Sequence, residues 1–223
     1  MLATANIANT NQEERQPKKT SHSKILVLID AGHGGIDAKG NYTTAPSKMF
    51  KHPHFTFFEG VYNRQVAKKL AEKLQAEGIE FEFVHHEIKD LSLSERYNFV
   101  NKRSKERKCI LFSIHGNAAA NLGANYFSVW TSPGQTESDK IATILYQELQ
   151  KEFPNERFSS QNEDGDVDWE ANFAMVAKTI CPAVLSENGF FSNEKQATKM
   201  LTDEWQNKVA QAHFNTVLKY ISK

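Results

Sequence analysis

The chain has 223 residues, of which 39% are hydrophobic, and its 27 basic side chains balance 27 acidic ones. A chain of this length can form one large domain with a substantial core. The balanced charge argues against nucleic acid or an anionic membrane as a partner. No apolar run reaches the roughly 18 residues that a membrane span needs. We therefore expect a globular protein whose partner is neither nucleic acid nor a membrane.

Residues 1–23 are polar and show no periodic apolar pattern, so we expect a flexible N-terminal leader. The first ten residues lack both the basic segment and the long apolar stretch of a secretory signal peptide. Either the protein is not exported by that route or its signal has been removed. We expect residues 24–223 to form a single catalytic domain.

Apolar runs and helical periodicities alternate along this domain. Strands are expected at residues 24–30, 79–85, 108–115, 126–131, 173–177 and 182–187. Helices are expected at residues 59–77, 92–101, 137–151, 193–201 and 203–221. Apolar residues recur at intervals of four in the first helix, and Ser92 with Glu95 has the spacing of a capping box at the start of the second. Polar loops are expected at 36–58, which is rich in aromatic, lysine and histidine residues, and at 154–169. The alternation predicts an α/β fold with three layers: a mostly parallel, twisted sheet with helices on both faces.

Polar side chains lie at or just after the carboxyl ends of three predicted strands: His33, His115 and Glu187. Because the carboxyl ends of parallel strands lie at one edge of a sheet, these side chains can converge there. Glu59 joins them if it starts the first helix beside the loop that leaves His33. Two imidazoles and a carboxylate form a catalytic zinc set with one position open for water, and they suit zinc better than calcium or magnesium. We predict one Zn²⁺ at His33, Glu59 and His115, with Glu187 as the general base.

Each of these residues also has an ordinary interpretation. A histidine after a strand is by default a hydrogen-bonded loop residue. Glu59 fits the first turn of a helix, where the dipole favours an acid, and Glu187 can cap a helix or pair with a lysine. The four positions are far apart in sequence, so only the topology makes their convergence plausible.

Four segments in this order resemble one enzyme family: Asp30-Ala-Gly-His33-Gly-Gly35, Glu59-Gly-Val-Tyr-Asn63, Ser113-Ile-His115-Gly-Asn117-Ala118, and Pro182-Ala-Val-Leu-Ser-Glu187-Asn-Gly-Phe-Phe-Ser-Asn193. The chain from about residue 24 onward resembles the zinc-dependent N-acetylmuramoyl-L-alanine amidases, which include cell-division amidases and phage and sporulation lysins. The resemblance implies that His33, Glu59 and His115 bind zinc and that Glu187 is the catalytic acid/base. It also implies hydrolysis of the amide between the lactyl group of N-acetylmuramic acid and the L-alanine of the peptidoglycan stem.

The resemblance implies further properties. The substrate is peptidoglycan, the site of action is the cell wall in the periplasm or outside the cell, and we expect a monomer, with any activating or targeting partner unknown. Asp30 is expected to support a metal-bound histidine by accepting its other N–H, or else to stabilise the turn. We expect no inhibitory helix between His115 and Glu187, an interval that holds Asp164, Asp166, Asp168 and Glu170.

Two other functions compete with this one. The first is a zinc peptidase or deacylase of similar fold that acts on another amide. The second is a wall-binding protein without catalysis, which the intact four-residue set argues against, because a binder needs no general base.

Three details leave alternatives open. Cys109 and Cys181 each lie six residues before a site residue, so they can be strand neighbours; we expect free thiols rather than a disulfide. The rings and cations of loop 36–58 can stack on sugar and meet stem-peptide carboxylates, or they can pack on the domain. His52 and His54 point to opposite sides if extended, which argues against a second metal site.

Overall fold

The computed structural model describes residues 25–161 and 165–222. The predicted leader, residues 1–23, lies outside the described residues. The described chain forms a seven-stranded sheet in the order β4-β1-β5-β9-β6-β7, with β8 also paired to β6, and a separate two-stranded hairpin. Its strands, in that order, are β4 (Phe81–Phe83), β1 (Leu26–Ala31), β5 (Cys109–Asn117), β9 (Ala183–Phe190), β6 (Tyr126–Thr131), β7 (Arg157–Phe158) and β8 (Trp169–Glu170).

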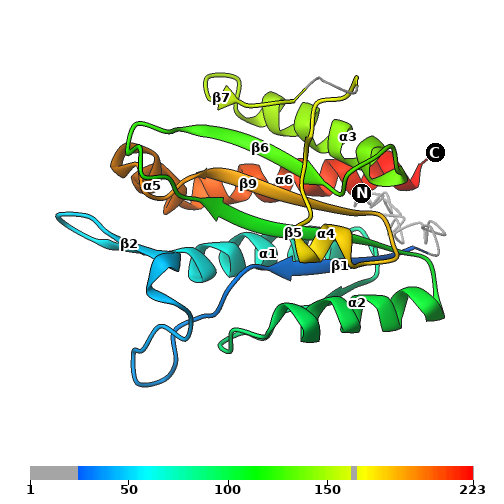
Figure 1. Cartoon of the computed structure of the whole chain (residues 1–223), viewed down its shortest axis with the longest axis horizontal. Coiled ribbons are helices and arrows are strands. Elements are labelled where there is room, and N and C mark those ends of the chain that lie inside the picture. The colour runs from blue at the N-terminus through cyan, green and yellow to red at the C-terminus, as the bar shows by residue number, and fades with distance from the viewer. Residues whose placement is uncertain (1–24, 162–164, 223) are drawn as a thin grey trace, which may run out of the picture.

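The sheet is mostly parallel, as predicted (Figure 1). The pair between β6 and β9 is antiparallel, whereas β7 and β8 run parallel to β6. All six residues of β1 are buried, as expected for a central strand that is covered on both faces. The carboxyl ends of β1, β5 and β9 therefore meet at one edge.

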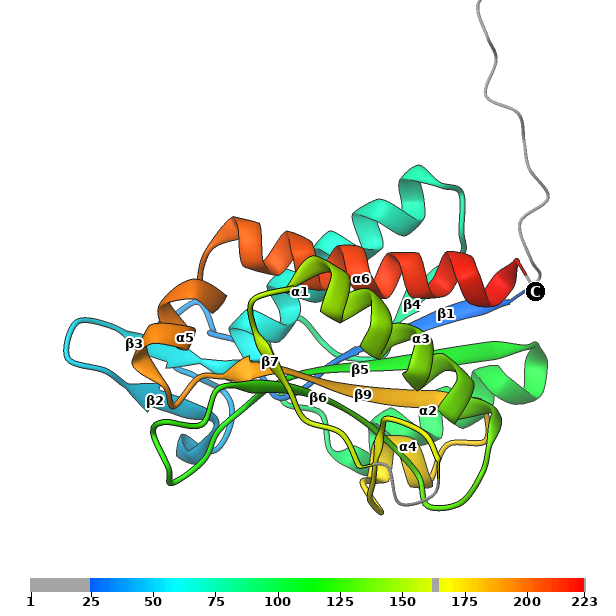
Figure 2. The same ribbon diagram turned by 90° about the horizontal axis from the view of Figure 1, so that it is seen from above.

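Helices cover both faces of the sheet, which confirms the three-layer prediction (Figure 2). One layer contains α1 (Glu59–Ala76), α3 (Glu137–Glu152) and α6 (Asp203–Ile221), and the other contains α2 (Leu93–Glu106) and α4 (Ala174–Ala177). The short α5 (Glu194–Met200) precedes α6. Two hydrophobic clusters result, one on each side of the sheet.

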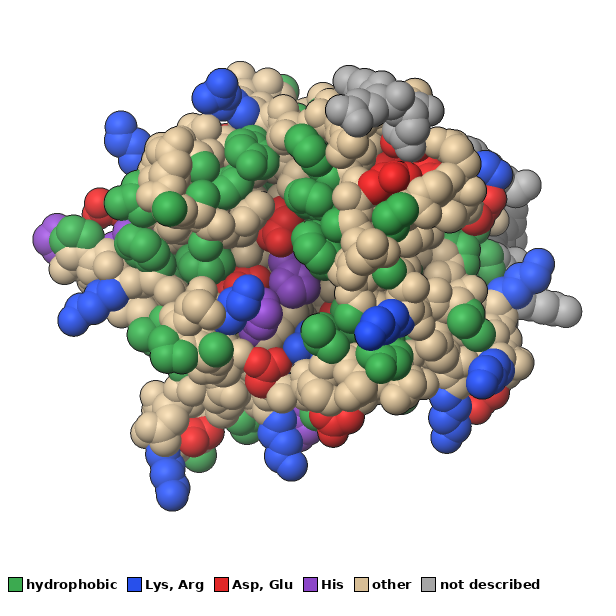
Figure 3. Space-filling view, viewed as in Figure 1, with side chains coloured by type: hydrophobic (Ala, Val, Ile, Leu, Met, Phe, Trp, Pro, Cys, Tyr) green, Lys and Arg blue, Asp and Glu red, His purple; other side chains and the backbone are tan. Residues whose placement is uncertain are grey.

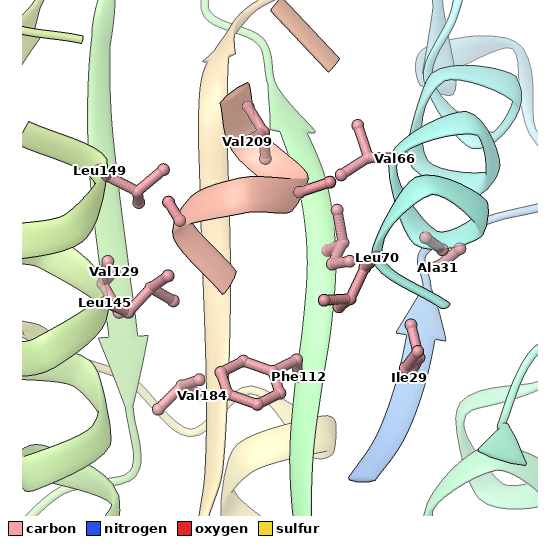
Figure 4. Close-up of a cluster of buried hydrophobic side chains, with 14 of the residues drawn as sticks. Ile29, Ala31, Val66, Leu70, Phe112, Val129, Leu145, Leu149, Val184 and Val209 are labelled. Carbon is pink, nitrogen blue, oxygen red and sulfur yellow. The ribbon is translucent and has the colours of Figure 1, made fainter. Parts of the chain in front are cut away.

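The larger cluster lies between the sheet and helices α1, α3 and α6 (Figure 4). Val66 and Leu70 of α1 and Val209 of α6 are fully buried there, and they pack toward Phe112 of β5. Burial of such side chains contributes roughly 1.5–3 kcal/mol each. This packing holds α1 against the sheet and thereby positions the first residue of the helix, Glu59.

Local signals explain where helices begin. Ser92 caps α2: its hydroxyl accepts from the backbone N–H of Glu95, and the Glu95 carboxylate accepts from the Ser92 N–H, which is the predicted capping box. The helix continues five residues beyond the predicted end at 101, to Glu106. Polar residues 102–106 carry no apolar pattern, but nothing in them stops a helix.

Three predicted segments differ from the structure. Residues 173–177 were expected to form a strand, but Ala174–Ala177 is a helical turn, because a short apolar run does not distinguish the two. The expected loop at 154–169 contains β7 and the first residue of β8. The expected loop at 36–58 contains a 3₁₀ turn (Pro46–Lys48) and the hairpin of β2 (Met49–Lys51) and β3 (Thr56–Phe58).

Cys109 and Cys181 are both free thiols. The β5–β9 register pairs Leu111 with Ala183, so the predicted neighbouring position of the two cysteines agrees with the sheet. Within residues 25–161 and 165–222, no helix is long and apolar enough to cross a bilayer.

Candidate active site

His33 lies in the turn that follows β1. Among the described residues it is the only non-glycine residue in the left-handed backbone region, with a φ of 66°. Such a conformation is uncommon outside glycine and is often found at functional sites. The preceding Gly32 lies against His115: an added Cβ would be 2.0 Å from the His115 ring. The glycine is therefore required for the two imidazoles to approach each other.

Glu59 is the first residue of α1 and joins the two histidines. Its Oε1 lies 3.0 Å from His115 Nδ1 and 3.3 Å from His33 Nε2. The two rings meet edge to face, with centroids 5.2 Å apart. One ligand atom from each residue lies within 4.8 Å of the others. The structure thus brings together the three residues that were predicted as metal ligands.

The start of α1 is held in place by its neighbours. The Gly60 N–H donates to the Tyr42 hydroxyl at 2.9 Å. A Cβ on Gly60 would lie 1.9 Å from the Gly34 carbonyl oxygen, so only glycine allows this approach. Asn63 Nδ2 donates to the Gly32 carbonyl at 3.1 Å and ties the turn before His33 to the helix. This role of Asn63 was not predicted, although its position four residues after Glu59 places it on the same helix face.

Electrostatics keep Glu59 ionised. Burial acts to raise the pKa of Glu59, but hydrogen bonds and charge from His115 and His33 outweigh it and lower the pKa to about 2. Burial likewise acts to lower the pKa of His115, but Glu59 raises it overall. An anionic carboxylate between two imidazoles offers one oxygen and two nitrogens to a cation. This donor set fits zinc.

Glu187 lies beside this set. It is the register partner of His115 on the neighbouring strand β9. Its Oε2 is buried and has no hydrogen-bond partner. Burial raises the pKa of Glu187 to about 7, and the charge of Glu59 adds to the effect. A carboxyl group that titrates near neutral pH can both accept and donate a proton.

The four residues line one pocket of about 470 Å³, a size typical of binding sites. Figure 3 shows imidazole groups at the bottom of a hollow near the middle of this face, with acidic side chains beside them. The other walls come from the 3₁₀ turn before β2, the start of α2, the end of β5 with the residue after it, the region around α4, and β9 with the residue after it. Their residues are Ser47, Lys48, Leu93, Gly116, Asn117, Ala118, Phe173, Ala174, Met175, Leu185 and Phe191.

The interval between His115 and Glu187 contributes no acid to the pocket among the described residues. Its helices are α3 and α4, and the lining residues at α4 are Phe173, Ala174 and Met175. Asp164 lies outside the described residues.

Asp30 has a different role from the expected support of a histidine. Its side chain is buried; Oδ2 accepts from the Ser113 hydroxyl at 2.8 Å, and Oδ1 faces the Arg96 guanidinium at 3.4 Å. Arg96 also pairs with Asp90 at 2.9 Å. Asp30 therefore ties β1 to β5 and α2. The strand pattern could not reveal this, because the partners are distant in sequence.

Most rings of loop 36–58 pack on the domain. Phe57 is fully buried and stacks on Phe191 with ring centroids 5.4 Å apart. His52 is buried and hydrogen-bonds the Phe191 carbonyl through Nε2 at 2.9 Å. Lys48, one of the loop cations expected either to meet the substrate or to pack on the domain, lines the pocket.

Comparisons with known proteins agree with this site. A family model described as N-acetylmuramoyl-L-alanine amidase matches residues 27–219. The chain is 29% identical over 197 residues to the uncharacterized protein YqiI of Bacillus subtilis, with 87% of this chain and 84% of that protein covered. It is 27% identical to the probable cell wall amidase LytH of Staphylococcus epidermidis, covering 88% of this chain and 58% of that relative.

A solved structure shows the same fold. The N-acetylmuramoyl-L-alanine amidase from Clostridium difficile 630 superposes with a TM-score of 0.74 and 26% identity, over 90% of this chain and 99% of that one. The family match, the fold and the converging polar residues are consistent with one another. This chain belongs to the N-acetylmuramoyl-L-alanine amidase family.

Proposed function

We propose that this chain hydrolyses the amide between N-acetylmuramic acid and L-alanine in peptidoglycan, with one Zn²⁺ held by His33, Glu59 and His115 and with Glu187 as the acid/base. The observation that carries the proposal is the position of Glu187. Its buried, unpartnered oxygen lies in the same pocket as the three clustered ligand atoms. A buried carboxylate without a donor is costly, and proton transfer to a substrate gives it a function.

The metal set supports zinc by its chemistry. Two imidazole nitrogens and one carboxylate oxygen match a catalytic zinc site, which has three protein ligands. When bound, zinc supplies a Lewis acid that acidifies water and polarises the scissile carbonyl. The anionic state of Glu59 and the edge-to-face arrangement of the two rings prepare the site for a cation.

Glu187 transfers the proton in both halves of the reaction. Its carboxylate takes a proton from the attacking water while the water oxygen bonds to the lactyl carbonyl carbon. The resulting carboxyl group then donates this proton to the alanine nitrogen as the carbon–nitrogen bond breaks. The products are a free lactyl carboxyl group and a free amine. A pKa of about 7 suits both steps.

The walls of the pocket suit a glycopeptide. Lys48 provides a cation that can attract the carboxylates of the stem peptide, and Phe173 and Met175 provide apolar contacts. The substrate lies in the cell wall, so we propose that the protein acts there, in the periplasm or outside the cell. We propose a monomer with a complete site.

Mass spectrometry of purified muropeptides after incubation with the protein tests this function. Release of intact stem peptides that begin with L-alanine, lost on addition of a chelator, is the expected result. Products cut between amino acids would instead identify a peptidase. Retention on purified cell wall without any product would identify a binding protein.

A further inference from the structure

A second group of carboxylates lies outside the active site. Asp139, Asp166 and Asp168 each place one carboxylate oxygen within 4.8 Å of the others. Asp139 belongs to the first turn of α3, and the other two precede β8. None of the three lines the pocket that contains His33 and His115.

The hydrogen bonds of these carboxylates do not account for all their oxygens. The Thr131 hydroxyl donates to Asp168 Oδ2 at 2.5 Å, and Gln135 Nε2 donates to Asp166 Oδ2 at 3.3 Å. Asp139 accepts from the backbone N–H and the hydroxyl of Thr136 in a capping box. Within the part of the chain that the structure describes, no lysine or arginine forms a salt bridge with any of the three.

Two oxygens are left without a donor. Asp168 is 1% exposed, and its Oδ1 is buried without a hydrogen-bond partner. The Oδ1 atom of Asp166 is also buried without a hydrogen-bond partner. Buried carboxylates normally have donors, because an unsatisfied charged oxygen is costly. Burial raises the pKa of Asp168 to about 7, and the charges of Asp166 and Asp139 add to this effect. Three acids at this spacing therefore repel one another unless a proton or a cation lies between them.

We propose that Asp139, Asp166 and Asp168 bind one Ca²⁺. The donors are all oxygens, which hard divalent cations prefer and which argues against zinc. The unpartnered oxygens of Asp166 and Asp168 supply ligands that no protein donor uses. Water molecules would supply the remaining ligands of the six to eight that calcium takes. Calcium sites in extracellular modules have dissociation constants of about 10⁻⁴ to 10⁻³ M.

The ion would join three elements at one edge of the sheet. Asp139 belongs to α3, Asp168 is bonded to Thr131 at the end of β6, which pairs with β8, and Asp166 lies in the segment that leads to β8. Figure 1 shows this segment crossing the sheet edge and continuing to α4. Phe173 and Met175 at α4 line the active-site pocket. Calcium bound to Asp166 and Asp168 would therefore stabilise the segment that leads to this wall of the pocket.

Terbium luminescence tests the site directly. Trp169 adjoins Asp168, and its ring lies 5.5 Å from that of Trp130, so bound Tb³⁺ would be excited through tryptophan. With zinc-loaded protein we expect saturable emission that Ca²⁺ displaces. Asp168→Asn and Asp166→Asn should each weaken the apparent terbium affinity at least about 10-fold, which corresponds to about 1.4 kcal/mol of binding free energy.

Two controls separate this site from the active site. Asp203→Asn removes an exposed aspartate of α6 that pairs with Lys69, and it should leave the emission unchanged. His33→Ala should also leave it unchanged, so the outcome does not depend on the proposed amidase activity. Emission that persists in both cluster variants, or that Ca²⁺ does not displace, would overturn the proposal.

Thermal unfolding provides a second test, because the variant and the native chain should differ in opposite directions without calcium and with calcium. Without calcium, Asp166→Asn should melt at the same temperature as the native chain or higher, because a repelling charge is removed. With millimolar calcium, the native chain should gain a few degrees and the variant should not, since an ion that binds only the folded state stabilises it. A melting temperature of the native chain that does not respond to calcium contradicts the site. The Asp166 variant is used here because Asp166 is less buried than Asp168, so that its replacement disturbs the fold less.

Discussion

His115 and Glu187 are register partners on the hydrogen-bonded parallel strands β5 and β9. A slip of one residue would turn one of the two side chains to the other face of the sheet. The register shifts between His115 and Asn117, which pairs with Phe190, and Asn188 Nδ2 donates to the His115 carbonyl at 3.0 Å beside this irregularity. Strand register therefore places the proposed acid/base beside a proposed metal ligand.

Glu187→Gln should abolish most of the hydrolysis without removing zinc. The amide keeps the size of the side chain but cannot accept the proton from water, so kcat should fall about 10²- to 10⁴-fold. Muropeptide turnover and metal content measured on the same sample check this. Glu204→Gln, an exposed change on α6 that removes a pair with Lys208, should leave both values unchanged. Normal turnover by Glu187→Gln would remove Glu187 from the mechanism.

His33→Ala should lower the zinc content and the activity together. Its imidazole is one of three ligand atoms clustered within 4.8 Å, and two remaining ligands bind zinc weakly. Metal analysis of protein dialysed against dilute chelator measures the loss. His54→Ala changes an exposed histidine of the β2–β3 hairpin and should retain the zinc. Full zinc occupancy in His33→Ala would show that zinc binds without the His33 imidazole and would contradict the proposed ligand set.

Gly32→Ala should disturb the site through a single methyl group. Its Cβ would meet the ring of His115 at 2.0 Å, so the two histidines would be forced apart. We expect reduced zinc affinity and a loss of about 1–3 kcal/mol in unfolding free energy, as for other overpacked sites. Zinc titration and urea unfolding measure these effects. Gly123→Ala, in an exposed loop without close backbone contact, is the matched control and should change neither quantity.

His213 should make the fold sensitive to mild acid. It is fully buried; Nδ1 donates to the Val209 carbonyl at 2.8 Å, and Nε2 accepts from the Ser186 hydroxyl at 2.9 Å. Burial lowers its pKa from 6.5 to about 4. The unfolded chain therefore binds the proton more tightly, and stability is lost as pH falls from about 6.5 to about 4, by at most about 3 kcal/mol.

Urea unfolding at pH 7.5 and at pH 5 measures this effect. His213→Gln should lose less stability between the two pH values than the native chain does, even if it is less stable at pH 7.5. His54→Gln serves as the control and should keep the native pH dependence. Equal pH dependence in the native chain and His213→Gln would assign the acid sensitivity to other groups.

The sequence by itself determined the parts that depend on local patterns. Apolar runs predicted the central strands, because a strand buried on both faces consists mainly of apolar residues. Intervals of four predicted α1, and Ser92 with Glu95 predicted the start of α2. The polar residues at or just after the ends of three predicted strands, with Glu59, predicted the four residues that line one pocket, because parallel strand ends share one edge. The structure extends two of these strands beyond the site residues, to Asn117 in β5 and Phe190 in β9.

Only the tertiary structure decided what depends on contacts between distant segments. The register of β5 and β9, the left-handed backbone of His33 and the pairing of Asp30 with Arg96 rest on packing that no local pattern records. The same holds for α4, whose short apolar run suits a strand or a helix equally well. The three carboxylates at Asp139, Asp166 and Asp168 also met only in the fold, since α3 and the segment before β8 pack together at the sheet edge.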